Sequence, residues 1–466
     1  MNSHKLSLRE KLAYGCGDFA SCLFWATFGS FLFIFYTDVF GISAIAVGTM
    51  LGISRALDAF FDPAMGLLAD RTRTRWGKFR PYLLWVAVPF AVAGVLLFTT
   101  PHLAETGKLV WAYVTYNLMM ALYSAINIPY TALLGVITPD SIERTKVSSV
   151  KFIFAFAANI AVQAVLLTLV NRFGGDNPQR GWQLAAMVVA ATAMVFFFIA
   201  FIGTKERVAP PVHQKTSPIK DLGDLVRNGP WLTLVGATVA FVLFVATQST
   251  VSAHYIKYFV GSQQLALPWN TAPQLYTYDQ SISVFLTAGS IGALIGVVAT
   301  GPVVNRIGKK AAYIGFFAVA ISSRLGFFWL GPEQLMMMIC LHFISSLAGG
   351  PLSVILWAMY ADTADYSEWK RGRRATGLIF SASIMSQKFC WAIAGVVVGW
   401  MLNATGFIPN VQQSASVRHG LVLLISIVPS IFGTISIILV LFYRLNEKRV
   451  AEIQADLTER RAINPA

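Results

Sequence analysis

Apolar runs long enough to cross a lipid bilayer recur along the whole chain. A membrane-spanning helix needs about 20 mostly apolar residues, and about twelve such runs lie between charged or Pro/Gly-rich breaks in the 466 residues. They cover residues 13–37, 45–69, 81–100, 109–137, 152–171, 183–203, 231–259, 280–303, 311–330, 335–360, 376–403 and 419–443. Charged residues make up only 12% of the chain, about half the usual fraction of a soluble domain. The sequence therefore excludes a soluble globule and predicts an all-α membrane protein with twelve transmembrane helices.

The positive charges gather in alternate loops. Lys and Arg number 36 against 22 Asp and Glu, a formal net charge of +14. No basic stretch is interleaved with stacking aromatics, which argues against nucleic acid as a partner. The basic clusters fall in the even-numbered loops, for example at residues 71–80, 205–227 and 370–374. Because loops rich in Lys and Arg stay on the cytoplasmic side of a membrane, we expect these loops and both termini in the cytoplasm.

The chain divides near its middle. The longest hydrophilic stretch separates six spans from six and is rich in proline. An internal repeat supports this division, because GLLADR at 66–71 follows the second span and GPVVNRIGKK at 301–310 follows the eighth. Two six-helix halves with a binding site near the membrane midplane form the architecture of many secondary transporters. We expect an N-terminal half at 1–203, a cytoplasmic middle loop at 204–230, a C-terminal half at 231–443 and a cytoplasmic tail at 444–466.

The second span carries three ionisable side chains on one helix face. Arg55, Asp58 and Asp62 are spaced i, i+3 and i+7, and a charge at the bilayer centre costs ~2.5–3.5 kcal/mol on insertion scales. Two carboxylates held together in a low dielectric repel each other, which favours binding of a proton or of a small hard cation. We therefore predict a cation or proton site at Asp58 and Asp62, with Arg55 neutralising one of them when the site is empty. The alternative is a structural salt bridge between helices.

Isolated charges occur in three further spans. Asp18 follows Gly15-Cys-Gly17, where small residues let another helix or a ligand approach closely. Its carboxylate can accept hydrogen bonds from ligand hydroxyl groups, or it can pair with Lys388 in the eleventh span, and the two roles are compatible. Lys151 begins the fifth span and either binds ligand or extends toward the membrane interface.

The fourth span presents a polar face. Tyr123, Ser124, Asn127 and Tyr130 recur beside Pro129, and a proline within a helix frees a backbone carbonyl. Such a face in a lipid environment is typical of a cavity lining. We include Tyr123, Ser124 and Asn127 among the candidate binding residues.

Motifs of enzymes and of nucleotide-driven pumps do not occur. The sequence has no P-loop, no GxSxG elbow and no HExxH, and its four cysteines show no CxxC spacing. We expect no catalytic residues and no cofactor, and no metal ion beyond a possible Na+ at Asp58 and Asp62. Nothing in the sequence implies an obligate protein partner.

Six segments together resemble one transporter family. They are YTD at 36–38, RALDAFFDP at 55–63, RWGKFRP at 75–81, NIPY at 127–130, DTADYSE at 362–368 and GFIPN at 406–410. They are similar to the signature of the glycoside-pentoside-hexuronide:cation symporters of the major facilitator superfamily, and the likeness covers nearly the whole chain. The resemblance implies symport of a sugar, glycoside or hexuronide with H+ or Na+ into a bacterial cell across its inner membrane.

The melibiose permease branch of that family implies roles for individual residues. Its cation-binding carboxylates map onto Asp58 and Asp62 with a hydroxyl at Ser124, and its sugar-binding aspartate maps onto Asp18. The branch carries an aspartate where this chain has Asn127, a lysine where this chain has Gly17, and an arginine where Lys151 falls. Lys388 is kept. With one carboxylate fewer to strip water from Na+, the resemblance favours H+ as the coupling ion.

Charged clusters at two cytoplasmic loops are candidate latches between helix ends. Their alternative role is topology and solubility alone. Other functions that fit part of the sequence are a cation-coupled lipid or lysolipid carrier, a sensor that binds sugar without transport and, least of all, a membrane enzyme. The candidate gating residues are Asp70, Arg71, Arg75, Asp362, Asp365 and Arg374.

Overall fold

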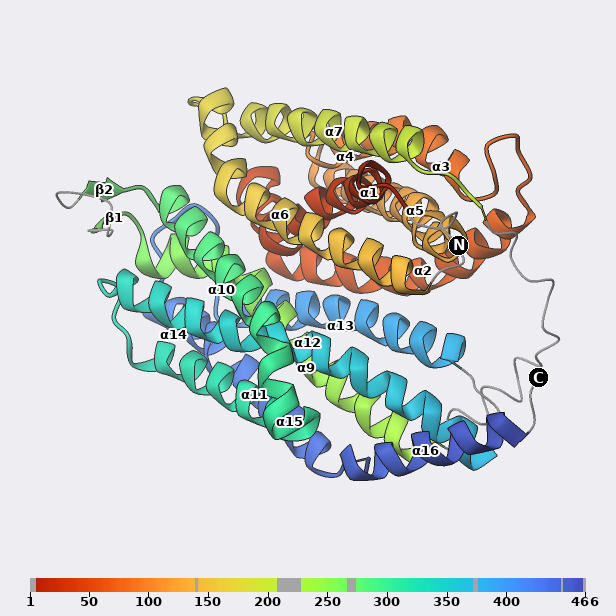
Figure 1. The fold of residues 1–466 in the computed structure, drawn as a ribbon. Helices are drawn as coiled ribbons and strands as arrows, with labels where there is room; N and C mark the ends of the chain where they lie inside the picture. The colour runs from red at the N-terminus through yellow and green to blue at the C-terminus, as the bar shows by residue number, and fades with distance from the viewer. Residues whose placement is uncertain are drawn as a thin grey trace. The chain divides into compact units, whose positions relative to one another are not determined.

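The computed structural model describes residues 6–138, 141–207, 228–265, 274–371, 376–445 and 447–463. Helices make up most of them and form two compact units (Figure 1). The predicted middle loop lies outside the described residues from 208 to 227, and the division into halves at 204–230 stays a prediction. The first unit comprises the described residues of Met1–His213, Asp279–Thr287 and Gly399–Gln413, and the second unit those of Gln214–Tyr278, Ala288–Val398 and Ser414–Ala466.

Long helices separated by short breaks follow one another along the chain. The N-terminal elements are α1 (Leu8–Thr27), the π-helical turns η1 (Phe28–Leu32) and η2 (Phe35–Phe40), α2 (Ala44–Arg71), α3 (Arg80–Trp85), α4 (Ala87–Leu97), α5 (Glu105–Ile137), α6 (Ser141–Gly174) and α7 (Pro178–Gly203). The C-terminal elements are α9 (Gly229–Tyr255), the π-helical turn η3 (Ile256–Val260), β1 (Gln263–Leu265), β2 (Gln274–Tyr276), α10 (Tyr278–Ile307), α11 (Lys309–Gly326), the 3-10 turn η4 (Phe327–Trp329), α12 (Leu335–Arg371), α13 (Thr376–Ala404), α14 (Ala415–Ile425), α15 (Ile427–Leu441) and α16 (Glu447–Ile463). The two strands pair antiparallel, with Gln264 opposite Leu275.

Each predicted span coincides with helical structure. Within the described residues, eight helices are long and apolar enough to cross a membrane. The remaining four predicted spans correspond to α1 with its π-helical turns, to α2, to α3 with α4, and to α13. The protein is therefore an all-α, multi-pass membrane protein, as predicted. The helix α16 and the strand pair were not predicted.

The ends of the first span follow from local chemistry. The Ser7 side chain accepts a hydrogen bond from the Glu10 N–H at 3.2 Å and so caps α1. At the other end, Gly41 adopts a φ of +81°, and its N–H donates to the Tyr36 carbonyl at 3.0 Å. Glycine takes this left-handed conformation without steric cost, and the helical segment ends there.

Small residues let α1 pack closely with its neighbours. A Cβ built on Gly203 of α7 would lie 2.3 Å from the Ala13 Cβ, and one on Gly94 of α4 would lie 2.3 Å from the Phe24 ring. The helix α1 packs against both α6 and α7. Backbones that approach this closely gain van der Waals contact, which is what associates helices in lipid.

In the first unit, a carboxylate that follows α7 caps the start of α3. The Glu206 side chain accepts hydrogen bonds from the N–H groups of Lys78, Phe79 and Arg80 at 2.9, 2.8 and 2.9 Å. These are orphan donors of a helix N-terminus, where a negative charge is favourable. Gly77 has a φ of +113°, and a Cβ there would lie 2.3 Å from the Glu206 carboxyl carbon. The RWGKFRP segment therefore needs its glycine for this cap.

The second unit repeats the arrangement. The Glu447 carboxylate accepts a hydrogen bond from the Lys309 N–H at the start of α11, and Gly308 before it has a φ of +83°. The Lys310 ammonium donates to the Leu441 carbonyl at the end of α15 at 2.8 Å. The GPVVNRIGKK repeat thus serves the same local purpose as RWGKFRP, since both let a carboxylate cap a helix.

Candidate functional site

Helices α2 and α5 bring the two predicted cation-site carboxylates to one serine. The Ser124 Oγ lies 3.2 Å from Asp58 Oδ1 and 2.6 Å from Asp62 Oδ1. Asp58 is 2% exposed and Ser124 is 1% exposed, while Asp62 is half-buried. Three oxygen-bearing side chains therefore converge within the part of the first unit that spans the membrane.

The Ser124 hydroxyl carries a single proton. It can donate to one carboxylate at a time, although both oxygens lie within hydrogen-bonding distance of it. The second contact is favourable when the other carboxylate carries a proton, or when a cation lies among the three oxygens. The geometry therefore suits the exchange of one positive charge.

Arg55 is held beside this pair on the same helix. Its Nη1 lies 3.6 Å from Asp58 Oδ2, longer than a hydrogen bond, and its guanidinium carbon lies 5.1 Å from the centre of the Trp25 ring. The contact with Asp58 is electrostatic, and the aromatic face supports the cation. Because Arg55 and Asp58 both belong to α2, their pairing does not join two helices, unlike the salt bridge that the sequence left as an alternative.

Asp18 pairs with the fifth-span lysine. The Lys151 Nζ lies 3.5 Å from Asp18 Oδ1, and the Cys22 Sγ lies 3.9 Å from Asp18 Oδ2. Asp18 is buried, whereas the Lys151 side chain is 21% exposed. Lys388, which was considered as the partner of Asp18, is half-buried on α13 in the second unit. The ion pair that the structure contains thus joins α1 to α6.

The other polar candidates of the fourth span lie along α5. Tyr123 and Asn127 are half-buried, and the Tyr123 ring lies 5.6 Å from the Trp25 ring, measured between centroids. Trp25 therefore contacts both Tyr123 and Arg55, and it links the α1 face with the cation-site face of α2.

Two candidate gating residues of the first unit, Arg71 and Arg75, are exposed. Arg71 is exposed at the end of α2, and the Arg75 guanidinium lies 4.5 Å from the centre of the Trp76 ring. The side chain of Asp70 lies outside what the structure describes. The predicted latch at this loop stays a prediction.

Two candidate gating residues of the second unit, Asp362 and Asp365, lie on α12. The Asp362 carboxylate is buried and forms an ion pair with the Lys309 ammonium of α11, and Asp365 is half-buried. Arg374 falls outside the described residues. Asp362 therefore links two helices of its own unit.

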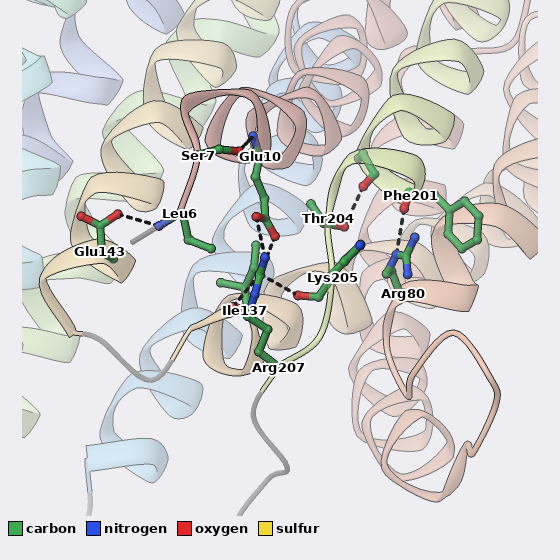
Figure 2. A network of polar contacts seen from close by, with 11 residues as sticks. Leu6, Ser7, Glu10, Arg80, Ile137, Glu143, Phe201, Thr204, Lys205 and Arg207 are labelled. Atoms are coloured by element: carbon green, nitrogen blue, oxygen red, sulfur yellow. Dashed lines mark hydrogen bonds and ion pairs between the residues drawn. The ribbon is translucent and has the colours of Figure 1, made fainter. Parts of the chain in front are cut away.

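A second charged network, which sequence reasoning missed, joins helix ends of the first unit (Figure 2). The Arg207 guanidinium donates to both Glu10 carboxylate oxygens at 2.6 and 2.9 Å and to the Ile137 carbonyl at 3.2 Å. The hydrogen bond with Glu10 raises the pKa of Arg207. The signal in the sequence was an acidic residue within a basic terminus.

Glu143 is the other acid of this network. Its carboxylate lies 2.6 Å from the Lys11 ammonium and 2.7 Å from the Lys146 ammonium. Hydrogen bonds from these two lysines lower the pKa of Glu143 from 4.5 to about 2. Glu143 therefore keeps its charge at physiological pH and ties the start of α6 to α1.

A buried arginine in the second unit was also missed. Arg324 of α11 is 0% exposed, donates to the Ser345 Oγ at 3.1 Å and contacts the His342 ring nitrogen Nδ1. The signal was its position inside the ninth apolar run.

The described residues contain no group of three or more His, Cys, Asp or Glu side chains that could hold a metal ion. The oxygen donors that converge in the first unit are instead the two carboxylates and the hydroxyl of Asp58, Asp62 and Ser124. That set can take a proton or a monovalent cation with additional water ligands.

Comparison with known proteins adds three findings. Residues 13–447 match a family described as MFS/sugar transport protein. An isoprimeverose transporter of Lactiplantibacillus pentosus is 36% identical over 97% of this chain and 92% of its own, and an inner membrane symporter, YicJ, of Escherichia coli (strain K12) is 35% identical over 98% and 96%. A solved bacterial homologue of the human drug peptide transporters PepT1 and PepT2 has a TM-score of 0.67 and 13% identity over 96% of this chain and 99% of its own, a likeness of fold alone.

Proposed function

The chain belongs to the MFS/sugar transport protein family and is a cation-coupled sugar symporter, not an enzyme, and from this premise we propose that Asp58 and Asp62 bind the coupling ion. Asp18 and Lys151 bind the sugar. The observation that carries the proposal is the Ser124 hydroxyl, which contacts both carboxylates with one proton to donate. Tyr123 and Asn127 complete the polar lining of this unit, and Lys388 stays a predicted substrate-binding residue.

The coupling ion is H+ in preference to Na+. A bound Na+ must lose water, and carboxylates offset that loss. The position that could supply a third carboxylate is occupied by Asn127. A proton needs only one carboxylate oxygen, and it also gives the Ser124 oxygen a second hydrogen-bonding partner.

The substrate is a neutral sugar or glycoside. Lys151 already faces the Asp18 carboxylate at 3.5 Å, so the pair offers one acceptor group and one donor group with no net charge. Hydroxyl groups can use both, whereas a substrate carboxylate would have to compete with Asp18 for the ammonium. A hexuronide is therefore the weaker ligand of the two.

Coupling between the two sites is electrostatic. Two carboxylates beside the single Arg55 guanidinium carry a net negative charge when no ion is bound, and a net charge in a low dielectric disfavours the rearrangement of helices. Cation and sugar must raise each other's affinity by the same factor. Transport then proceeds by alternating access in a bacterial inner membrane, with both termini in the cytoplasm, as the basic even-numbered loops support.

Uptake into proteoliposomes tests the proposal. The panel contains methyl β-xyloside, α- and β-galactosides, a glucuronide and free pentoses, each under an imposed H+ gradient and then under a Na+ gradient. We expect accumulation of a neutral sugar driven by the H+ gradient. Accumulation driven by Na+ alone would overturn the ion assignment, and preferred uptake of the glucuronide would overturn the substrate assignment.

The variant Asp18→Asn tests the sugar site in the same vesicles. We expect its counterflow of the transported sugar to fall by ~10- to 100-fold, the worth of hydrogen bonds to a charged group. Asp176→Asn is the matched control, because Asp176 is exposed in the turn after α6. Equal counterflow in Asp18→Asn and in the control would remove Asp18 from the site.

A further inference from the structure

Tyr130 lies beside the Asp18–Lys151 ion pair. It is completely buried on α5. Its hydroxyl donates to the Tyr14 carbonyl at 2.8 Å, and the Tyr14 hydroxyl donates back to the Tyr130 carbonyl at 3.2 Å. The two rings stack with centroids 4.7 Å apart. This reciprocal contact fixes the Tyr130 ring relative to α1.

The attachment point is the helical turn that carries Asp18. Tyr14 lies four residues before Asp18, and the carbonyl of residue i accepts the helix bond of residue i+4. The Tyr130 hydroxyl therefore bonds the same carbonyl that closes the turn ending at Asp18. A tyrosine of the fourth span thus holds the backbone that presents the carboxylate.

The other partner of the pair rests on the same ring. The Lys151 ammonium lies 5.6 Å from the centre of the Tyr130 ring, within the range of a cation–π contact. A lysine side chain without such a support extends toward the membrane interface. The ring face therefore gives the ammonium a second contact besides the Asp18 carboxylate, whose Oδ1 lies 3.5 Å away.

Gly17 provides the room for this ring. A Cβ at position 17 would lie 2.5 Å from the Tyr130 ring atom Cε2, closer than two carbon atoms approach. Any larger side chain at this position would displace the ring. The pair on α1 and α6 thus depends on a glycine next to Asp18 and on a tyrosine from α5.

We propose that Tyr130 is a positioning residue of the sugar site, which sets the distance between Lys151 and Asp18. Position 17 must be a glycine because a side chain there would displace the Tyr130 ring. This inference rests on the proposed role of the Asp18–Lys151 pair in sugar binding. The positioning itself can be measured without any sugar, so the two claims can fail separately.

Chemical labelling of Lys151 measures the positioning. The purified protein is exposed to an amine-acetylating reagent, and the modified fraction at Lys151 is compared by mass spectrometry with that at Lys146, whose side chain is 55% exposed. We expect Tyr130→Leu to speed labelling of Lys151 by at least about 5-fold, because the cation–π contact is lost. Tyr130→Phe keeps the ring but loses the hydroxyl that bonds the Tyr14 carbonyl, so its labelling rate should lie between those of wild type and Tyr130→Leu.

Two further variants separate positioning from a general loss of packing. Gly17→Ala should displace the ring and raise the Lys151 labelling rate, but adding it to Tyr130→Leu should have no further effect. Tyr313→Leu removes a fully buried tyrosine of the second unit and should leave the rate unchanged. Equal Lys151 labelling in wild type and Tyr130→Leu, or a rise in Tyr313→Leu as large as in Tyr130→Leu, would overturn the inference.

Counterflow of the transported sugar links the inference to function. Where Lys151 labelling rises in Tyr130→Leu, we expect the half-saturating sugar concentration to rise by ~10-fold while the cation dependence stays as in wild type. An unchanged half-saturating concentration in a variant with accelerated labelling would contradict the role in the sugar site. If Asp18→Asn also binds sugar normally, the proposed sugar site is wrong while the positioning of Lys151 by Tyr130 stands.

Discussion

Two groups of carboxylates in the first unit differ in the hydrogen-bond donors and cations that contact them. Glu10, Glu143 and Glu206 receive N–H or ammonium donors at 2.6–2.9 Å. Asp58 and Asp62 instead share one hydroxyl, and Arg55 lies 3.6 Å from Asp58. The first group lies at helix ends and the second lies inside the predicted second span.

The difference separates a structural carboxylate from an exchanging one. Several charge-assisted hydrogen bonds stabilise the charged form of a carboxylate. Such a carboxylate stays ionised over a wide pH range and holds helix ends together throughout that range. Asp58 and Asp62, which meet at one hydroxyl beside one guanidinium, keep a net negative charge, and binding one more positive charge is favourable there. Carboxylates therefore hold helix ends together in one region of the molecule and, in our proposal, bind the coupling ion in another.

The largest expected effect comes from breaking the Asp18–Lys151 pair on one side only. Lys151→Met leaves the buried Asp18 carboxylate without its cation and should lower the free energy of unfolding. The loss should not exceed about 3 kcal/mol, because the Lys151 side chain is partly exposed and water can take over part of its role. The double variant Asp18→Asn/Lys151→Met should regain most of the lost melting temperature but not sugar counterflow. Thermal unfolding in detergent and counterflow measure the two results. A double variant as unstable as Lys151→Met would show that the pair is not an isolated unit.

Removing the shared hydroxyl should have the next largest effect. Ser124→Ala takes away a hydrogen bond to a charged group, worth ~1.5–3 kcal/mol. We expect the coupling-ion concentration that gives half-maximal uptake to rise by ~10-fold. Thr115→Ala is the matched control, because Thr115 lies on the same helix and its hydroxyl donates to the Trp111 carbonyl. Ion dependence is read from uptake at a series of external pH values. If both variants behave alike, Ser124 has no special link to the ion.

The cap of α3 should affect stability and leave binding intact. Glu206→Gln removes the charge that accepts three backbone hydrogen bonds, at a cost of about 1 kcal/mol. We expect a lower melting temperature and an unchanged half-saturating sugar concentration. Glu333→Gln, at an exposed position before α12, is the control. A loss of sugar affinity in Glu206→Gln would contradict the assignment of Glu206 to the structural group of carboxylates.

The variant Glu143→Gln should have the smallest effect on stability, and this effect should depend on pH with a defined sign. Its pKa is lowered from 4.5 to about 2 by Lys11 and Lys146, so its stabilising contribution is complete above pH 4.5 and is lost as the pH falls through about 2. The difference in melting temperature between wild type and Glu143→Gln should be positive at pH 6 and shrink between pH 4.5 and 2. Glu105→Gln, exposed at the start of α5, should show no such trend. A difference that grows on acidification would contradict the assignment.

Length and local spacing were enough to predict the helices and the cation-site face. Apolar runs of about 20 residues must form helices in a membrane, since every backbone group needs an internal partner. The spacing of Asp58 and Asp62 places them one turn apart in any helix. The choice of Ser124 as their shared partner came from the family resemblance, and the structure brings it within 3.2 Å of both.

Contacts between helices could not be predicted from spacing. Lys388 and Lys151 are both lone cations in spans, and only the packing of α1 against α6 makes Lys151 the partner of Asp18. The caps by Glu206 and Glu447 join segments more than 100 residues apart. The glycines at these caps, Gly77 and Gly308, belong to motifs that the sequence shows. The carboxylates that cap the helices there could not be identified from the sequence.

The central claim is that the Asp58–Asp62 pair carries the coupling ion, and the variant Asp58→Asn tests it most directly. The measurement compares, in the same proteoliposomes, gradient-driven accumulation of the transported sugar with its counterflow at equal ion concentrations. The account predicts that accumulation is lost while counterflow remains, because the sugar site on α1 and α6 is intact and the step that couples it to the ion is not. Undiminished accumulation with wild-type ion dependence would contradict it.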